Sequence, residues 1–475
     1  MLKQLLAIKH AHVARADAEQ LDLVRTLGPW GLTAIGIGAV IGGGIFVITG
    51  QAAADHAGPA IILSFVLAAL CCTFCALCYA ELASMVPVSG SAYTYTYATL
   101  GELAAWFIGW MLVLEYGVSA SAVAVSWTGY FLSFLEHFNI HLPAALTNAP
   151  LDGQLKPTGA LMNLPAAGIV LALTALCYVG IRESTTVNSI MVVLKTGLIL
   201  IVIFAGWKYV DPQLWEPFIP ANEGPGKYGW EGVLRGASMV FFAYIGFEAT
   251  SVAAQESKNP QRDLPIGMLA SLAICTVLYI AMAAVMTGLT PFGQLGTNEP
   301  VVTAVASHPE LAWLRVVVEV GALIGLSSVV LVMIIAQPRI FMIMGRDGLL
   351  PRLFTTIHPK YRTPHINTVI TGIGIALLAA VFPLDILGEL TSMGTLIAFA
   401  AVCGGVWILR HTQPDLPRPF RIRLAPLVCL AGIVSCGILL STMTIHNWML
   451  MLVWGVFGLV VYFAYGYRHS RLRAG

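Results

Sequence analysis

The chain has 475 residues, of which 58% are hydrophobic and 10% charged, and its mean hydropathy is +0.81. Because an ordinary soluble domain carries about 25% charged residues, this composition excludes a soluble fold and predicts an all-α, polytopic membrane protein. The formal net charge of +1 gives no acidic or basic bias that would indicate nucleic acid as a partner.

Residues 1–28 are expected to form a cytoplasmic tail. Charged residues interrupt their short apolar runs at Lys3, Lys9, Arg15, Asp17, Glu19, Asp22 and Arg25. A secretory signal peptide needs an uninterrupted apolar stretch before a small-residue cleavage site, and this segment does not contain one.

Twelve apolar runs follow, and each is close to the roughly 20 residues that a helix needs to cross a bilayer core. The predicted spans cover residues 29–55, 58–84, 102–132, 163–181, 186–207, 230–255, 264–288, 311–339, 365–382, 387–409, 421–441 and 446–467.

Lysine and arginine predict the orientation, because cytoplasmic loops of membrane proteins hold an excess of both. With the N-terminus inside, 19 of the 25 fall on the cytoplasmic side, five fall outside, and Lys195 lies within a span. An even number of spans places both termini in the cytoplasm. The sequence therefore predicts a multi-pass protein of the cytoplasmic membrane, and the absence of N-x-Ser/Thr sites favours a bacterial one.

Glycines interrupt the first span. Gly42, Gly43 and Gly44 lie at mid-span, where each costs a helix roughly 1 kcal/mol relative to alanine. Close helix packing is an alternative explanation, since Gly38 and Gly42 form a G-x-x-x-G pair. A dinucleotide-binding fingerprint is rejected because no strand precedes these glycines. We predict a broken helix here.

Four of the nine cysteines lie in the second span, at Cys71, Cys72, Cys75 and Cys78. A membrane helix would have to unwind to gather four thiolates around one ion. We therefore interpret these cysteines as small helix-packing residues and expect no metal, no cofactor and no disulfide framework.

Two ionisable residues lie deep within predicted spans. Lys195 in span five has no nearby helix end, and an unpaired lysine at this depth costs about 2.5–3.5 kcal/mol, so it is a functional candidate. Burial favours its neutral form, which suits it to carry a proton; a structural ion pair is the alternative. Glu115 in span three could recognise a substrate cation, bind Lys195 or cap a water-filled cavity.

Span six contains a second candidate break at residues 241–248, where Gly246 and Glu248 interrupt an aromatic run. An aromatic-rich core helix is an equally good interpretation. However, paired interrupted spans at corresponding positions of two repeats are typical of the central site of a secondary transporter. Half-helix N-termini attract a carboxylate and unwound carbonyls accept bonds from an ammonium, so such a site suits an amino-acid zwitterion.

The remaining polar residues within spans have weaker signals. Ser327 and Ser328 in span eight could supply hydroxyls near Lys195, although serines in membrane helices usually bond to the backbone. Structural hydrogen-bonding roles are expected for Glu81, Glu248 and Glu319, which lie near span ends or in uncertain registers.

Six segments together resemble the amino acid-polyamine-organocation superfamily, and within it the cationic amino acid transporter family. They are residues 36–47 (GIGAVIGGGIFV), 79–82 (YAEL), 87–93 (PVSGSAY), 241–248 (FFAYIGFE), 259–265 (NPQRDLP) and 346–351 (RDGLLP). The resemblance covers nearly the whole chain. It implies a leucine-transporter-type fold with inverted five-helix repeats and alternating access. The transport core would be residues 29–410, with inverted repeats at about 29–207 and 230–410, followed by two extra helices at 411–467 and a cytoplasmic tail at 468–475.

The resemblance also implies a substrate site. The substrate carboxylate would lie at the amides of Gly42, Gly43 and Gly44, and the site would take in the rest of both breaks: Val40, Ile41, Phe242, Ala243, Tyr244 and Ile245. The amine would be held by the carbonyls of Val40, Phe242, Ala243 and Ile245. Lys195 would carry the proton, with its ammonium in the place of a sodium ion. Glu115 matches members linked with basic side chains.

Two positions depart from the family pattern. Gly43 stands where many members have threonine, which predicts a looser or larger carboxylate end of the site. Glu248 stands where aspartate is common, so a longer carboxylate ties span six to its neighbours.

The leading hypothesis is a proton symporter that imports cationic or small neutral L-amino acids such as alanine. An amino acid exchanger, a sodium-coupled symporter and a membrane subunit without transport remain alternatives. Heterodimeric relatives use a cysteine between spans three and four, and residues 133–162 contain none. A disulfide-linked heavy chain is therefore not expected, nor is enzymatic activity.

Overall fold

The computed structural model describes residues 7–9, 27–88, 90–179, 185–361 and 363–473. Most of the predicted cytoplasmic tail, including Lys3, Arg15 and Arg25, lies outside these residues. Within them the regular structure is helical, apart from three isolated β-bridges. The all-α prediction is confirmed.

Nine predicted spans correspond to continuous helices. They are α5 (Ile61–Met85), α9 (Leu164–Val179), α10 (Thr185–Trp207), α13 (Pro260–Leu289), α15 (Ala312–Arg346), α16 (His365–Val381), α17 (Leu384–Thr412), α18 (Ala425–Ser441) and α19 (Ile445–Val461).

The other three predicted spans, one, three and six, contain changes of helical winding. Span one consists of α3 (Pro29–Val40), a π-helical turn (Gly44–Ile48), α4 (Thr49–Ala52) and a second π-helical turn (Ala53–Ala57). Span three consists of α7 (Glu102–Leu112), a π-helical turn (Val113–Val118) and α8 (Ser119–Glu136). Span six consists of α11 (Gly229–Val240), a 3-10 turn (Phe241–Tyr244) and α12 (Ala249–Val252).

Seven helical segments among the described residues are long and apolar enough to cross a membrane, and four shorter apolar helices accompany them. The protein is a polytopic membrane protein, whereas the number of twelve crossings stays a prediction. Two short helices lie in connections and were not expected from the sequence: α6 (Ser91–Thr99) and α14 (Pro300–Ala306). They have nine and seven residues, too few for a spanning helix.

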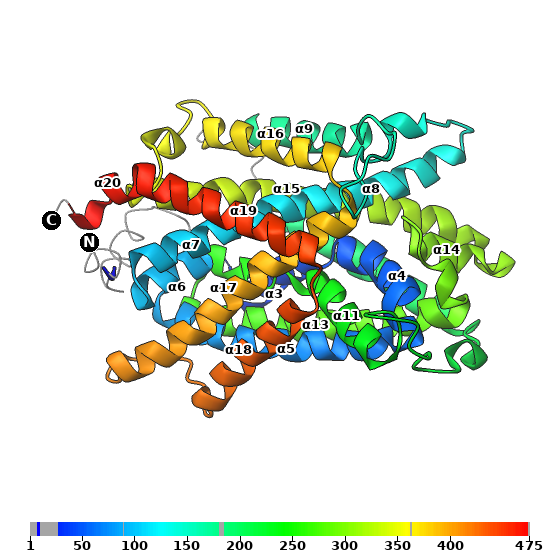
Figure 1. Cartoon of the computed structure of the whole chain (residues 1–475), viewed down its shortest axis with the longest axis horizontal. Coiled ribbons are helices and arrows are strands. Elements are labelled where there is room, and N and C mark those ends of the chain that lie inside the picture. Colours follow the sequence, from blue (N-terminus) through cyan, green and yellow to red (C-terminus); the bar gives the residue numbers. More distant parts are fainter. Residues whose placement is uncertain (1–6, 10–26, 89, 180–184, 362, 474–475) are drawn as a thin grey trace.

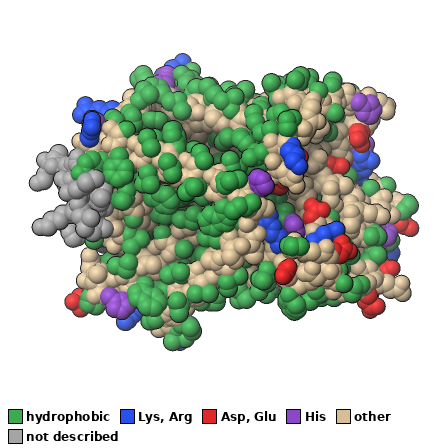
Figure 2. Space-filling view, in the orientation of Figure 1, with side chains coloured by type: hydrophobic (Ala, Val, Ile, Leu, Met, Phe, Trp, Pro, Cys, Tyr) green, Lys and Arg blue, Asp and Glu red, His purple; other side chains and the backbone are tan. Residues whose placement is uncertain are grey.

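The interrupted helix α3 lies inside the bundle. It packs against α10, α13 and α15, while α13 also packs against α5; α3, α5, α13 and α15 are labelled in Figure 1. Apolar side chains such as Val193 and Phe204 of α10 face outward. Figure 2 shows hydrophobic side chains over much of one face and acidic side chains gathered toward the right-hand end. The broken backbone is therefore shielded from lipid, which is where irregular backbone is tolerated in a membrane protein.

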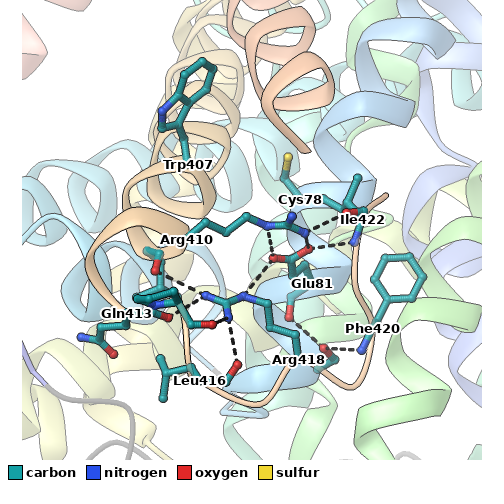
Figure 3. Close-up of polar contacts among 12 residues, drawn as sticks. Cys78, Glu81, Trp407, Arg410, Gln413, Leu416, Arg418, Phe420 and Ile422 are labelled. Carbon is teal, nitrogen blue, oxygen red and sulfur yellow. Dashed lines mark hydrogen bonds and ion pairs between the residues drawn. The ribbon is translucent and has the colours of Figure 1, made fainter. Parts of the chain in front are cut away.

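Glu81 joins three elements near the end of α5. Its carboxylate accepts hydrogen bonds from Arg410 at the end of α17 at 2.9 and 2.5 Å, and from the Ile422 amide before α18 at 2.9 Å (Figure 3). The guanidinium of Arg418 lies 3.5 Å away. These bonds give Glu81 the structural role that its place in the sequence indicated.

Candidate substrate and coupling site

The first span is broken where the glycines predict it. Helix α3 ends at Val40, and Ile41 has an extended backbone with φ −73° and ψ 97°. Helical winding resumes at Gly43 and continues into the turn that starts at Gly44. The first amides of a helix have no partner within it. The second half of span one therefore begins with amides of glycines that carry no side chain.

The second predicted break is also present. The 3-10 turn of span six ends at Tyr244, Ile245 is extended with φ −62° and ψ 129°, and α12 begins at Ala249. Gly246 has φ +126°, a conformation that glycine adopts without strain. The aromatic run therefore does not form one continuous core helix.

The two breaks meet each other. A Cβ atom added to Gly44 would lie 2.3 Å from Cα of Ala243, and one added to Gly246 would lie 2.8 Å from the carbonyl carbon of Ala39. Glycine is thus required for the close approach of the two backbones. The segments that the sequence placed in one substrate site lie side by side.

Two carbonyls of span one also receive tyrosine hydroxyls. Tyr279 of α13 donates to the carbonyl oxygen of Val40 at 2.8 Å, and Tyr130 of α8 donates to that of Phe46 at 2.6 Å. Tyr244 instead donates to the carbonyl oxygen of Phe65 at 3.1 Å, so its hydroxyl faces α5. Tyr279 and Tyr130 therefore hold the backbone around the break in place, and neither could be predicted from the sequence because each contact joins distant spans.

Gly43 does not leave its space open. A Cβ atom at this position would lie 2.7 Å from Oγ of Ser126 in α8. Ser126 is buried and donates to the carbonyl of Ala122 at 3.1 Å. The interpretation that Gly43 loosens or enlarges the site therefore needs correction, because a hydroxyl side chain from another helix occupies the place.

Lys195 reaches the end of the first half-helix. Its side chain is buried, and Nζ donates to the carbonyl oxygens of Gly38 at 2.5 Å and Ile41 at 3.2 Å. Among the described residues no carboxylate forms an ion pair with it. A cation at helix C-terminal carbonyls is favourable because these carbonyls carry the negative end of the helix dipole.

The hydroxyl groups of the two serines in span eight bond within their own helix and not to Lys195. Ser327 donates to the carbonyl of Leu323 at 2.7 Å, and Ser328 donates to that of Gly325 at 2.8 Å. Gly325 itself lies against the lysine stem, since an added Cβ would lie 3.2 Å from Cγ of Lys195. Span eight therefore contacts the lysine through a glycine, and both hydroxyls are used within the helix.

Glu115 meets Glu248 rather than Lys195. Glu115 lies in the π-helical turn of span three, and its carboxyl group interacts with that of Glu248. Both side chains are fully buried, and neither forms an ion pair with a described residue. Glu248 also accepts the Gly246 amide at 3.0 Å, which fixes the turn of span six. π-Helical turns are frequent at functional sites.

Buried hydroxyl groups surround this acidic pair. Tyr79 of α5 and Tyr116 of span three are electrostatic neighbours of both carboxyl groups, and the hydroxyl of Ser91 lies beside the two tyrosines. Neither carboxylate oxygen of Glu115 accepts a hydrogen bond of ordinary geometry from a described residue. The pair is thus a concentration of acceptors that a cation or further donors can satisfy.

Glu319 and a cavity in the connecting loops lie apart from both breaks. Glu319 accepts from Ser133 at 2.6 Å, from Arg315 at 3.0 Å and pairs with His137 at 2.7 Å, which is the structural role expected for it. The cavity, of about 570 Å³, is lined by ten of the residues between Ala144 and Ala160, together with Pro383 and Asp385. None of the predicted site residues lines it.

The family model for amino acid permeases matches residues 27–465. The chain belongs to this amino acid permease family. The branched-chain amino acid permease BcaP of Bacillus subtilis is 47% identical over 457 residues, which is 96% of each chain. The methylthioribose transporter of Bacillus subtilis is 44% identical over 99% of this permease and 100% of its relative. The vacuolar cationic amino acid transporter 4 of Arabidopsis thaliana is 37% identical over 86% of this permease and 67% of its relative.

The comparisons make this permease a transporter rather than an enzyme, and amino acid transport is its class of function. The relatives are named for substrates as different as branched-chain amino acids, cationic amino acids and a thiosugar. Family membership therefore does not identify the substrate, which depends on the residues of the binding site.

Proposed function

We propose that this permease imports L-amino acids across the cytoplasmic membrane by proton symport with alternating access. The observation that carries the proposal is the meeting of two broken spans beside a buried lysine. In this proposal the substrate carboxylate binds the amides of Gly42, Gly43 and Gly44. The carbonyls of Val40, Phe242, Ala243 and Ile245 hold its amine, and Ile41 and Tyr244 complete the two breaks.

Lys195 is proposed as the proton carrier. Its charged form donates to two carbonyls at the end of α3, and loss of the proton weakens both contacts. Protonation thus ties α10 to the break that binds substrate. Sodium coupling is less favoured, because an ammonium at this place repels a second cation.

Both termini are proposed to lie in the cytoplasm. Lys9 forms an ion pair with Asp347 at 2.8 Å, and the amide of Arg471 donates to the carbonyl of the same aspartate at 3.0 Å. Residues near the two ends of the chain therefore contact the same aspartate, which supports an even number of crossings. We also propose that the transport core consists of two inverted repeats, at about 29–207 and 230–410.

The acidic pair supports basic substrates. Two buried carboxyl groups without a counter-ion favour the ammonium or guanidinium of lysine, ornithine or arginine. The likeness to BcaP supports an apolar side chain as a second candidate. We therefore propose cationic and small neutral amino acids as substrates, to be compared directly with leucine, isoleucine and valine.

Uptake into proteoliposomes tests the function. With no internal substrate, an imposed inward proton gradient is expected to drive accumulation of a labelled amino acid, and a protonophore should abolish it. A panel of unlabelled amino acids and methylthioribose then ranks the substrates by competition. Uptake that requires internal amino acid would instead establish an exchanger, and uptake that requires sodium would remove the proton from the mechanism.

Replacing Glu115 by glutamine is expected to weaken arginine and lysine binding by about tenfold or more while leaving alanine largely unchanged. The reason is that charge-assisted contacts contribute about 1.5–3 kcal/mol. Competition binding with both substrate types measures the difference. Glu136→Gln, near the exposed end of the same span, is the control. Equal losses for alanine and arginine would assign Glu115 a structural role.

A further inference from the structure

Six buried cysteines from three helices form one row of sulfur atoms. Cys71, Cys75 and Cys78 belong to α5, Cys403 to α17, and Cys429 and Cys436 to α18. We call this set the sulfur row. The three helices pack directly against one another. The sequence showed only the α5 members as a cluster, because the contacts from α17 and α18 join residues more than 300 positions apart.

Within the row, three sulfur atoms are close enough to share one ion. Sγ of Cys436 lies 3.7 Å from Sγ of Cys71 and 3.7 Å from Sγ of Cys75, and all three atoms lie within 4.8 Å of one another. Cys403 follows at 3.9 Å from Cys75. No helix has to unwind for this, because the thiols come from two faces that already touch. The four cysteines of the second span alone could surround an ion only if their helix unwound, and this objection does not apply to ligands from two helices.

These separations match metal coordination. With metal–sulfur bonds of about 2.3 Å, sulfur ligands lie roughly 4.0 Å apart in a trigonal plane and roughly 3.8 Å apart in a tetrahedron. Gly432, between the two α18 cysteines, permits the close approach of Cys403 in α17, since an added Cβ would lie 2.7 Å from its Sγ. The sulfur atoms are therefore placed for an ion without a shift of the backbone.

Burial and ligand type select the ion. All three thiols are at most 1% exposed, so the complex has to be close to neutral. Thiolate sulfur prefers soft ions such as Cu⁺ over hard oxygen-seeking ions. A monovalent ion with one thiolate and two thiols is neutral: one S–H bond breaks, its proton leaves to water, and three sulfur–metal bonds form, one from the thiolate and two from the lone pairs of the intact thiols.

We propose that Cys71, Cys75 and Cys436 form a binding site for one soft monovalent cation, Cu⁺ or its analogue Ag⁺. Such an ion would cross-link α5 to α18. Helix α5 also contacts span six next to its break, where Tyr244 donates to the carbonyl of Phe65. A bound ion would therefore restrain a helix that contacts the proposed substrate site, and we expect it to inhibit uptake. This inference does not depend on which amino acid is carried.

Silver binding to the purified full-length protein tests the site. Wild type and three variants, Cys436→Ala, Cys71→Ala and Cys177→Ala, are incubated with silver nitrate in chloride-free buffer, desalted and analysed for silver per chain. Wild type and Cys177→Ala should each retain one more silver ion than the other two. Cys177 lies in α9, outside the sulfur row, and controls for loss of a buried thiol. Equal silver in all four proteins would overturn the proposal.

Wild-type protein alone provides a second measurement that does not depend on the folding of a variant. One equivalent of silver should slow alkylation of Cys71, Cys75 and Cys436 in mild denaturant, relative to Cys177, as followed by peptide mass spectrometry. Equal protection of all four cysteines, or none, would contradict a defined site.

Discussion

Replacing Lys195 by alanine is expected to reduce proton-driven uptake to the level of empty liposomes while substrate binding remains measurable. The substitution removes the ammonium that contacts the carbonyls of Gly38 and Ile41. It leaves the amides that follow the break in place. Coupling and binding should therefore separate, because one depends on the lysine proton and the other on the backbone.

Uptake under an imposed proton gradient and equilibrium binding of labelled substrate measure the two effects. Lys208→Ala is the matched control, because Lys208 follows α10 directly and its ammonium lies over the ring of Tyr209. It should retain wild-type uptake. Normal gradient-driven transport by Lys195→Ala would show that another group carries the proton, whereas loss of both binding and transport would make the lysine a structural support of α3.

The placement of Lys195 illustrates how much of this site the sequence can predict. Three glycines at mid-span and a charge within span five are local anomalies, and each has a local cost that only function or tertiary contacts can offset. The first break occurs where its three glycines predict it, and the break in span six occurs at Gly246, where an unbroken helix was an equally good interpretation of the sequence. The lysine contacts the broken span because its charge needs unpaired carbonyls, and a broken helix provides them.

Contacts between distant spans could not be predicted in the same way. The pairing of Glu115 with Glu248, the occupation of the Gly43 space by Ser126 and the convergence of cysteines from α5 and α18 all depend on helix rotation and register. A hydrophobic run in lipid specifies neither, because most of its faces are equally apolar. The hydrophobic pattern of the sequence therefore does not predict which of these residues face one another.

Helix ends show a related limit. Predicted span eight ends at residue 339, where Arg339 follows Pro338, yet α15 continues to Arg346 with the proline inside it. The polar boundary marks where the apolar run stops, while the helix continues for seven further residues. Neighbouring groups can satisfy the backbone carbonyl that a proline frees, so the helix need not end there.

Gly44→Ala is expected to have the other large effect, a roughly tenfold to hundredfold loss of substrate affinity. The added methyl group would lie 2.3 Å from Cα of Ala243, which is backbone and cannot rotate away. Overpacking of this kind costs about 1–3 kcal/mol, and each 1.4 kcal/mol corresponds to about tenfold in affinity. The two breaks would be forced apart, and the carboxylate and amine subsites proposed on either side would lose their spacing.

Binding of labelled substrate to purified Gly44→Ala, compared with Gly404→Ala, measures this effect. Gly404 lies in α17 with nothing within 4 Å of an added Cβ, so its substitution adds a methyl group without a clash. Alanine raises helix propensity at both positions. A loss of affinity seen only in Gly44→Ala is therefore due to the steric clash. If Gly44→Ala kept wild-type affinity for every substrate, the meeting of spans one and six would be a packing contact, and the substrate would have to bind elsewhere. Selective loss for large substrates would instead place the side-chain end, rather than the carboxylate end, at this contact.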